Sequence, residues 1–358
     1  MKPQELDALT YVPSLRSRLA ELRAYEKLRL ATKAQLHPII SLGKLGKLVD
    51  ANRVLERIAE TVPTEFFLDL NTHTGQSVSD IARLRDSANN YEAWRDFAGS
   101  VQRAIPVAIL REDETERPFI RQVLSLEAKH GVVAIRSRRP AQELASLQAV
   151  LSAVDDVNNV LIILDFGYVR GALASKEIEA LRVISALRTV DASARLVLMA
   201  SSFPKAISAY GERRGSLEII EREFHERLGG IDVAIYGDHG SIYPEPFEPS
   251  ISRYVPRIDY CSDHAWAYER RKVDEGGYVE CAKGIVASPD WEPAFAEASW
   301  GAKMVRDTAA SQAVPAGFGS PSGWISARVN MHLERQSTLS SMVQMVDGED
   351  NGDGEEAA

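Results

Sequence analysis

Eight short apolar runs, separated by stretches with helical spacing, constrain the fold of this chain more than any other feature. Each run is rich in Val, Ile, Leu or Phe, which is typical of strands buried on both faces. The runs are Tyr11–Leu15, Leu36–Leu42, Glu65–Leu70, Ile105–Leu110, Gly131–Ile135, Val160–Asp165, Arg195–Ala200 and Asp232–Tyr236.

Amphipathic helices are predicted between these runs, because apolar residues recur there at intervals of three and four, as at Leu144, Leu147 and Leu151. Eight strands joined by helical crossovers predict an α/β fold, a single (β/α)8 TIM-barrel-like domain. The alternative is an open doubly wound sheet, which often begins with a Gly-rich phosphate turn after its first strand. Here the first run leads into Arg16-Ser-Arg-Leu-Ala-Glu21 without a glycine, so the barrel is favoured.

The barrel is predicted to span residues 1–312, with a C-terminal segment, 313–346, packed on it. After the eighth run, Arg257–Cys261 and Trp266–Arg270 predict a hairpin, and Glu292–Ala309 is expected to form the closing helix of the barrel. Residues 347–358 contain six acidic and no basic side chains, interrupted by glycine, and are predicted to be a disordered acidic tail. Without that tail the net charge is −3 instead of −9, so positive and negative charges are nearly balanced in the rest of the chain.

Composition excludes several classes of protein. No run approaches the roughly 18 apolar residues of a membrane span, and the first residues lack the apolar core of a signal peptide. The two cysteines, Cys261 and Cys281, do not provide a disulfide framework, so a reduced, cytoplasmic location without membrane partners is expected. A nearly balanced body also argues against broad binding of duplex nucleic acid.

Acidic side chains stand at the carboxyl ends of three predicted strands, where barrels of this class build their active sites. Asp69, Asp165 and Asp238, with the adjacent His239, are the candidate catalytic residues. Converging carboxylates could divide general acid and base roles. They could also hold a divalent cation, although no cofactor is evident and no metal ligands are assigned. Each aspartate could instead cap a helix or close a turn, which suits Asp165-Phe-Gly167 well.

Basic side chains at the same predicted end indicate an anionic ligand, because arginine binds carboxylate or phosphate oxygens in a bidentate manner. The alternative is that each arginine pairs with a neighbouring acid. The candidate ligand-binding residues are Arg16, Arg111, Arg136, Arg138, Ser201 and Arg270.

Short motifs in a fixed order extend along most of the chain. They are Tyr11-Val-Pro-Ser-Leu-Arg16 followed by Glu21, Ser201-Ser-Phe-Pro204, Tyr236-Gly-Asp-His-Gly-Ser-Ile-Tyr-Pro244, Ile258-Asp-Tyr260 followed by Trp266, and Trp324 followed by Asn330-Met-His332. In this order they resemble the Beta protein family of phages and bacteria. The resemblance implies a barrel-like fold and a link to phages or mobile elements, and it transfers no catalytic assignment.

Several positions depart from the pattern of that family. Ser41 stands where the family usually carries an acid after its second strand, and His239 replaces an aromatic residue. Met331 replaces the first of two histidines, and Arg16 stands where a lysine is expected. If the acid or the histidine pair were catalytic, these departures would put the activity of this chain in doubt.

Two functions follow from these features. The first is a protein, enzyme or sensor, that binds a phosphate- or nucleotide-like anion at the mouth of the barrel, in the setting of phage–host conflict or antiviral defence. The second is a catalytically silent interaction or scaffold protein of a phage or defence system. The expected partner is accordingly a small anionic ligand or a protein from such a system, and fold alone does not choose between them.

Overall fold

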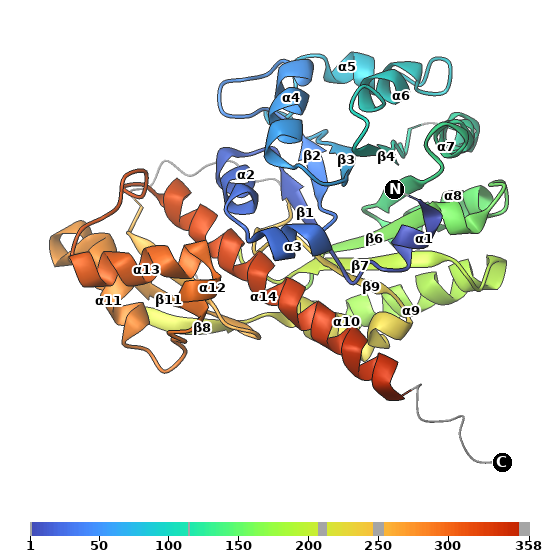
Figure 1. Cartoon of the computed structure of the whole chain (residues 1–358). Helices are drawn as coiled ribbons and strands as arrows, with labels where there is room; N and C mark the ends of the chain where they lie inside the picture. Colours follow the sequence, from blue (N-terminus) through green and yellow to red (C-terminus); the bar gives the residue numbers. More distant parts are fainter. Residues whose placement is uncertain (1, 114, 207–212, 246–253, 351–358) are drawn as a thin grey trace, which may run out of the picture.

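The computed structural model describes residues 2–113, 115–206, 213–245 and 254–350, with only the backbone described for 343–350. Its central feature is a closed barrel of eight parallel strands, which confirms the predicted fold class (Figure 1). The barrel strands, in spatial order, are β1 (Tyr11–Arg16), β2 (Ile39–Leu42), β3 (Phe66–Leu70), β4 (Ala104–Ala108), β5 (Val133–Ser137), β6 (Val160–Tyr168), β7 (Arg195–Ser201) and β9 (Ile235–Asp238).

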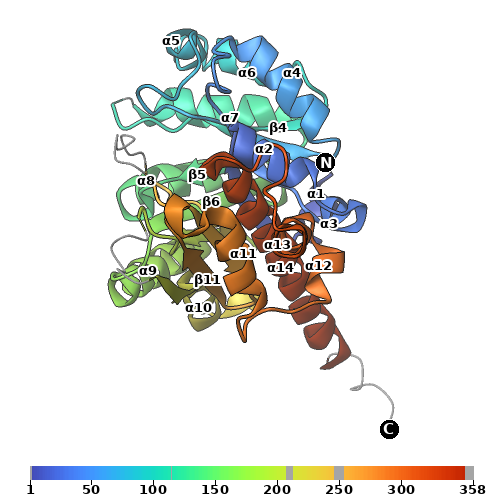
Figure 2. The same cartoon turned by 90° about the vertical axis from the view of Figure 1, so that its left-hand side faces the viewer.

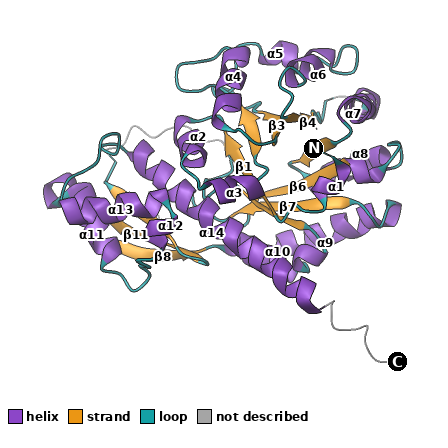
Figure 3. Ribbon diagram, viewed as in Figure 1, coloured by secondary structure: helices purple, strands orange, loops and turns teal. Residues whose placement is uncertain are grey.

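Helices surround these strands and connect them, as expected of parallel strands that need crossovers. Figure 3 shows the strands of the barrel with helices along its outside. In chain order the helices up to the last barrel strand are α1 (Pro3–Leu6), α2 (Leu19–Glu26), α3 (Leu30–Gln35), α4 (Ala51–Thr61), α5 (Ile81–Leu84), α6 (Glu92–Ala98), α7 (Glu116–His130), α8 (Pro140–Leu151), α9 (Leu173–Val190) and α10 (Ile220–Arg227).

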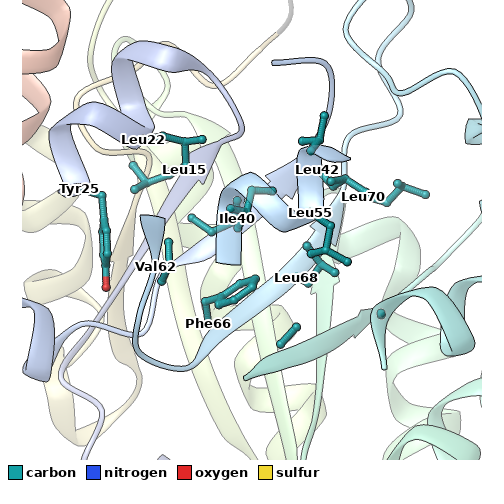
Figure 4. Close-up of a cluster of buried hydrophobic side chains, with 14 of the residues drawn as sticks. Leu15, Leu22, Tyr25, Ile40, Leu42, Leu55, Val62, Phe66, Leu68 and Leu70 are labelled. Atoms are coloured by element: carbon teal, nitrogen blue, oxygen red, sulfur yellow. The ribbon is translucent and has the colours of Figure 1, made fainter. Parts of the chain in front are cut away.

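Alternation of side chains along each strand divides the apolar residues into two sets. One set, including Val12, Phe67 and Leu161, fills the interior of the barrel. The other packs against the helices, and Figure 4 shows part of it around Leu15 and Ile40. Both faces of the strands are therefore buried, which explains why their sequences read as unbroken apolar runs.

The interior set becomes polar toward the carboxyl ends of the strands. On β1, every second residue after Val12 points to the same side, which gives Ser14 and then Arg16. On the other strands, the residues two positions after the interior apolar residues are found in the same way. The polar positions reached in this way include Ser14, Arg16, Ser41, Asp69, Arg136, Asp165 and Ser201. Strand periodicity thus directs a group of charged side chains into the mouth of the barrel.

A second layer lies beside the barrel. The strands β8 (Arg214–Glu218), β10 (Arg257–Cys261) and β11 (Ala265–Arg270) form an antiparallel sheet, which includes the predicted hairpin. This sheet and its helices share an apolar cluster of their own. The helices are α11 (Gly277–Val286), α12 (Phe295–Ala298) and α13 (Trp300–Ser311). Residues 292–309, which were expected to form one helix that closes the barrel, instead form α12 and most of α13 in this second layer. The range 1–312, which was predicted to be the barrel, therefore contains both the barrel and the second layer.

The last helix, α14 (Pro321–Asp350), runs between the barrel and the second layer (Figures 1 and 2). It packs on α2 from one side and on α13 and β10 from the other. It continues four residues into the range predicted to be an acidic tail, 347–358, and residues 351–358 lie outside the described part. Among the described helices, none combines the length and apolar character of a membrane span.

Candidate functional site

Arg136 of β5 lies at the centre of the barrel mouth and bonds to two acids from other strands. Its Nε and Nη2 atoms donate to Asp165 Oδ2 of β6 at 3.0 and 2.7 Å, and Nη1 donates to Asp69 Oδ2 of β3 at 3.0 Å. The side chain of Arg136 is only 4% exposed. A cation buried to this degree needs such partners, because an unpaired buried charge is costly.

Asp69 accepts hydrogen bonds from two further side chains, and the backbone N–H of Leu70 donates to its Oδ1 atom at 2.8 Å. The Arg138 guanidinium pairs with its Oδ2 atom, and Ser41 Oγ donates to the same oxygen at 3.1 Å. Burial on its own would raise the pKa of Asp69, but Arg138 and Arg136 hold it below its usual value. Asp69 is therefore an ionised acceptor behind the wall of the mouth.

Asp165 joins Arg136 to His239. Its Oδ1 atom lies 3.0 Å from His239 Nε2 and also accepts from the backbone N–H of Gly167. Burial opposes ionisation of Asp165, yet His239 and Arg136 lower the pKa of this carboxyl far below its usual value. Asp165 therefore closes a turn, as expected, by accepting from the N–H of Gly167, and it also pairs as a carboxylate with Arg136. A carboxylate that orients an imidazole at a cavity is an arrangement suited to proton transfer.

A cavity of about 310 Å³ opens above these side chains. The strand-end residues Arg16, Arg136, Arg138, Asp165 and His239 all line it. Its remaining wall includes Lys176, His73 and the tyrosines Tyr168 and Tyr243. Four predicted site residues, Arg16, Arg136, Arg138 and Asp165, therefore share one cavity with His239. This agrees with the expectation that side chains at the carboxyl ends of the strands lie close together.

A second and larger cavity, of about 1010 Å³, adjoins the first. Both are lined by Arg16, Glu21, Asn71, Ile242 and Tyr243. The second lies between the barrel mouth, α2 and α14, because its wall contains Leu19 and Arg328 from those helices. The mouth therefore continues into a cleft between the barrel and the second layer.

Cationic side chains outnumber acidic ones in the walls of the two cavities. Among the described residues, nine cationic side chains line them against three acidic ones, Glu21, Asp165 and Glu245. The cations are Arg16, Arg18, Lys44, Arg136, Arg138, Lys176, Lys205, Arg257 and Arg328. Asp69, Asp259 and Glu179 stand behind the wall as partners of some of these cations, so nine cations are set against six acids.

Arg18 differs from the paired cations around it. Its Nη2 atom donates to the neutral amide oxygen of Gln76 at 2.6 Å. Partial burial, followed by the nearby Arg16 charge, lowers the pKa of Arg18. By contrast, Arg16 pairs with Glu21 at 3.0 Å, and Arg328 pairs with Asp259 at 2.7 Å. An anion in the cleft would supply the negative charge that Gln76 lacks.

Besides Asp69, four predicted site residues line neither cavity. Arg111 pairs with Asp113 beyond the end of β4, and Arg270 lies at the end of β11 in the second layer. Ser201 is buried and donates from Oγ to the carbonyl of Ile242 at 3.0 Å. The fourth, Asp238, is fully buried on the other face of β9, and none of the four lines either cavity.

Asp238 instead belongs to a buried polar cluster that joins three parts of the molecule. It accepts from Tyr11 Oη of β1 at 2.8 Å and lies 2.9 Å from His332 Nε2 of α14. His332 Nδ1 lies 3.7 Å from Cys261 Sγ of β10. The cluster therefore links the barrel, the last helix and the second layer. Met331, which departs from the family pattern, precedes His332 and lies in the apolar cluster of the second layer.

Sequence reasoning missed Arg18, Tyr168 and Tyr243 as residues of the mouth. Arg18 follows Arg16 by two positions, so a count in steps of two would have found it. Tyr168 lies beyond an irregularity in β6 between Asp165 and Tyr168, at which Gly167 has a positive φ of 64°. Among the described residues, no group of three or more His, Cys, Asp or Glu side chains is arranged to hold a metal ion.

Comparison with known proteins supports the resemblance inferred from the motifs. The profile of the Beta protein family matches residues 11–338. The chain is also 33% identical over 341 residues to "Protein beta" of Enterobacteria phage P4, an alignment that covers 94% of this chain and 95% of the phage protein. The chain belongs to the Beta protein family.

Proposed function

We propose that the mouth of the barrel binds a phosphate-bearing anion, held mainly by Arg18, Lys44 and Arg138. The observation that carries this proposal is the excess of cations over acids in the two adjoining cavities. A structural network needs about as many acids as bases, because each buried charge requires a partner. The surplus positive charge is better explained by a ligand that brings negative charge with it.

The cations of the mouth have different parts in this proposal. Arg136 is held by Asp69 and Asp165, so it shapes the wall of the cavity and orients its neighbours. Arg138 is 42% exposed and keeps part of its guanidinium open to a ligand. Lys44 is exposed at the rim of the second cavity. Arginine and lysine of this kind bind phosphate oxygens by charge-assisted hydrogen bonds.

The setting that we propose is a phage or a mobile element, in conflict between phage and host. Its support is the similarity to a protein of Enterobacteria phage P4 and the family to which both belong. An anion-binding barrel in this setting would act as a sensor, or as an enzyme if Asp165 and His239 transfer a proton to or from the bound ligand.

A second candidate function is a catalytically silent interaction protein. It is favoured by the protein partners of the expected catalytic residues, since Asp69, Asp165 and Asp238 all accept hydrogen bonds from neighbouring side chains. In that case the charged network only stabilises the barrel. This second candidate predicts that small anions do not change the melting temperature of the protein.

Thermal unfolding with sodium tripolyphosphate, at constant ionic strength, tests the proposal. A ligand at 100 times its dissociation constant stabilises the folded protein by about 2.7 kcal/mol, which raises the melting temperature by a few degrees. The shift is expected in the wild type and in a control, Arg53→Gln with Arg57→Gln, which removes two charges from α4. It should be lost in Arg18→Gln with Lys44→Gln. An unresponsive wild type, or equal shifts in both variants, would contradict the proposal.

A further inference from the structure

We infer that the protein hydrolyses a phosphate monoester in the smaller cavity, with His73 as the general base and His239 as the general acid. This inference rests on the proposed function, because it names the reaction that the bound anion undergoes. It also goes beyond it, since binding alone needs the cations and no group that moves a proton.

The first support is the position of His239, which directly follows β9. Its side chain is buried in the wall of the smaller cavity, and its Nε2 atom lies 3.0 Å from Asp165 Oδ1. The same carboxylate is bonded to the buried side chain of Arg136, so its own position is fixed. A carboxylate on one ring nitrogen orients the imidazole and stabilises its protonated form. The other ring nitrogen of His239 is then the one that can give a proton to a ligand.

His73 is a second imidazole in the wall of the same cavity. It follows β3 by three residues and is half-buried. Burial, followed by the charge of Arg138 and of two further arginines of the mouth, lowers the pKa of His73 below its usual value. At neutral pH the ring is therefore uncharged, and a neutral imidazole has a nitrogen that can take a proton from water.

The two imidazoles differ in the charge that adjoins each of them. An ionised carboxylate contacts His239, whereas the charges that act most strongly on His73 are those of arginines. Two titratable groups with such different surroundings are typical of the acid and the base of one site. The cavity, of about 310 Å³, is small enough for one bound molecule to meet both rings.

Cations in the same wall meet the third requirement of the reaction, which is stabilisation of the phosphoryl oxygens. Arg138 lines the smaller cavity with a side chain that is 42% exposed, and Arg16 lines both cavities. Guanidinium groups hold phosphoryl oxygens by charge-assisted hydrogen bonds and stabilise charge that develops on them. A monoester carries two negative charges, which suits walls with more cations than acids.

The reaction is a single displacement by water. His73 takes a proton from the water molecule as the water oxygen bonds to phosphorus. The bond between phosphorus and the alcohol oxygen breaks, and His239 gives its proton to that oxygen. The products are an alcohol and inorganic phosphate, and exchange of protons with the solvent returns both rings to their starting states.

Steady-state hydrolysis of p-nitrophenyl phosphate and glycerol 2-phosphate by the full chain tests the inference. The p-nitrophenolate ion leaves without a proton, whereas the alkoxide of glycerol needs one. His239→Gln should therefore lower kcat for glycerol 2-phosphate by about a hundredfold or more, and kcat for p-nitrophenyl phosphate by less than about tenfold. His73→Gln should lower both by about a hundredfold or more, because both esters react with water. The control is His264→Gln, an exposed histidine that lines neither cavity, which should retain both rates.

The ratio of the two kcat values within one variant does not depend on how much of the protein is folded. It therefore remains informative if His239→Gln melts at a lower temperature than the wild type. An unchanged ratio in His239→Gln, or an undiminished kcat in His73→Gln, would overturn the inference. Faster hydrolysis of bis(p-nitrophenyl) phosphate than of p-nitrophenyl phosphate would overturn the monoester as the substrate.

The failure of this inference can be told from the failure of the proposed function. A wild type that is stabilised by tripolyphosphate but hydrolyses none of these esters would overturn the inference and leave the anion site standing. If tripolyphosphate gave no stabilisation and no ester were hydrolysed, both would be wrong.

Discussion

Arg136 is the residue around which the barrel mouth is organised. It lies on β5 but bonds to Asp69 of β3 and to Asp165 of β6, so it ties together strands that do not all neighbour one another. Both carboxylates are also bonded to other donors, Arg138 and His239. Removing the central cation would leave two buried carboxylates with only part of their positive partners.

Replacement of Arg136 by alanine should therefore be strongly destabilising, by about 3–5 kcal/mol in the free energy of unfolding. The control is Arg57→Ala, which breaks an exposed pair with Glu60 on α4 and should cost less than about 1 kcal/mol. Urea denaturation of the two variants measures both values. If the two losses were equal, Arg136 would not be the residue that holds the barrel mouth together.

His332 should make part of the stability depend on pH. Burial lowers the pKa of this histidine, but the Asp238 carboxylate outweighs burial and raises it from 6.5 to about 10. A group whose pKa rises on folding stabilises the folded state while it is protonated in both states, and that contribution is lost as the pH rises through the folded value. The stabilisation should thus be full below about pH 6.5 and fade toward pH 10.

The measurement is urea denaturation of the wild type and of His332→Gln at pH 6, 8 and 10. The stability advantage of the wild type should be largest at pH 6 and should shrink at each step. Comparison of the two proteins at each pH cancels the titration of other groups. An advantage that stayed constant from pH 6 to pH 10 would show that the histidine is not charged in the folded protein.

At the scale of the elements, α14 holds the barrel and the second layer together. It crosses α13 so closely that a Cβ atom at Gly301 would lie 2.1 Å from the carbonyl oxygen of Ala327. Asn330 of the same helix accepts from the backbone N–H of Gly301 and donates to the carbonyl of Ala24 in α2. Glycine at position 301 is thus required for the contact between the two helices.

Gly301→Ala should cost about 1–3 kcal/mol, because the added methyl group forces the helices apart. Gly319→Ala is the matched control, since a Cβ atom there meets no heavy atom within 4 Å and the residue does not have a positive φ. Thermal melts of the two variants give the comparison. A Gly301→Ala protein that melted at the wild-type temperature would contradict the close packing of α13 on α14.

The elements were largely predictable from the sequence, and one failure is instructive. All eight barrel strands overlap the predicted apolar runs, because strands buried on both faces need apolar residues at every position. Strand β8, Arg214-Gly-Ser-Leu-Glu218, was missed because four of its five residues are exposed. Such a strand has no apolar run, and only its pairing with β11 reveals it.

The site was predictable to the degree that strand ends determine it. Asp69, Arg136 and Asp165 meet as expected, because they continue the interior set of apolar residues in steps of two. Asp238 follows the outward-facing Tyr236, so the same count would have placed it outside the mouth. The cleft against α14 could not be predicted from strand patterns, because it depends on how the second layer packs.

At the scale of the whole molecule, the mouth of the barrel and the second layer form one positive cleft. Its wall combines Arg18 near β1, Lys205 after β7, Arg257 of β10 and Arg328 of α14. These residues are far apart in the sequence. Their positive charges lie together in a chain whose net charge is −9. Concentration of positive charge in one place of an acidic protein is the central reason to assign an anion to it.

The most direct test of that assignment is a crystal structure of the protein grown with tripolyphosphate and without sulfate or phosphate. The account predicts density for the anion in the cleft, with its oxygens roughly 3 Å from the nitrogen atoms of Arg18 and Lys44. Density at another surface, or a cleft filled by side chains alone at a saturating concentration of the anion, would contradict it.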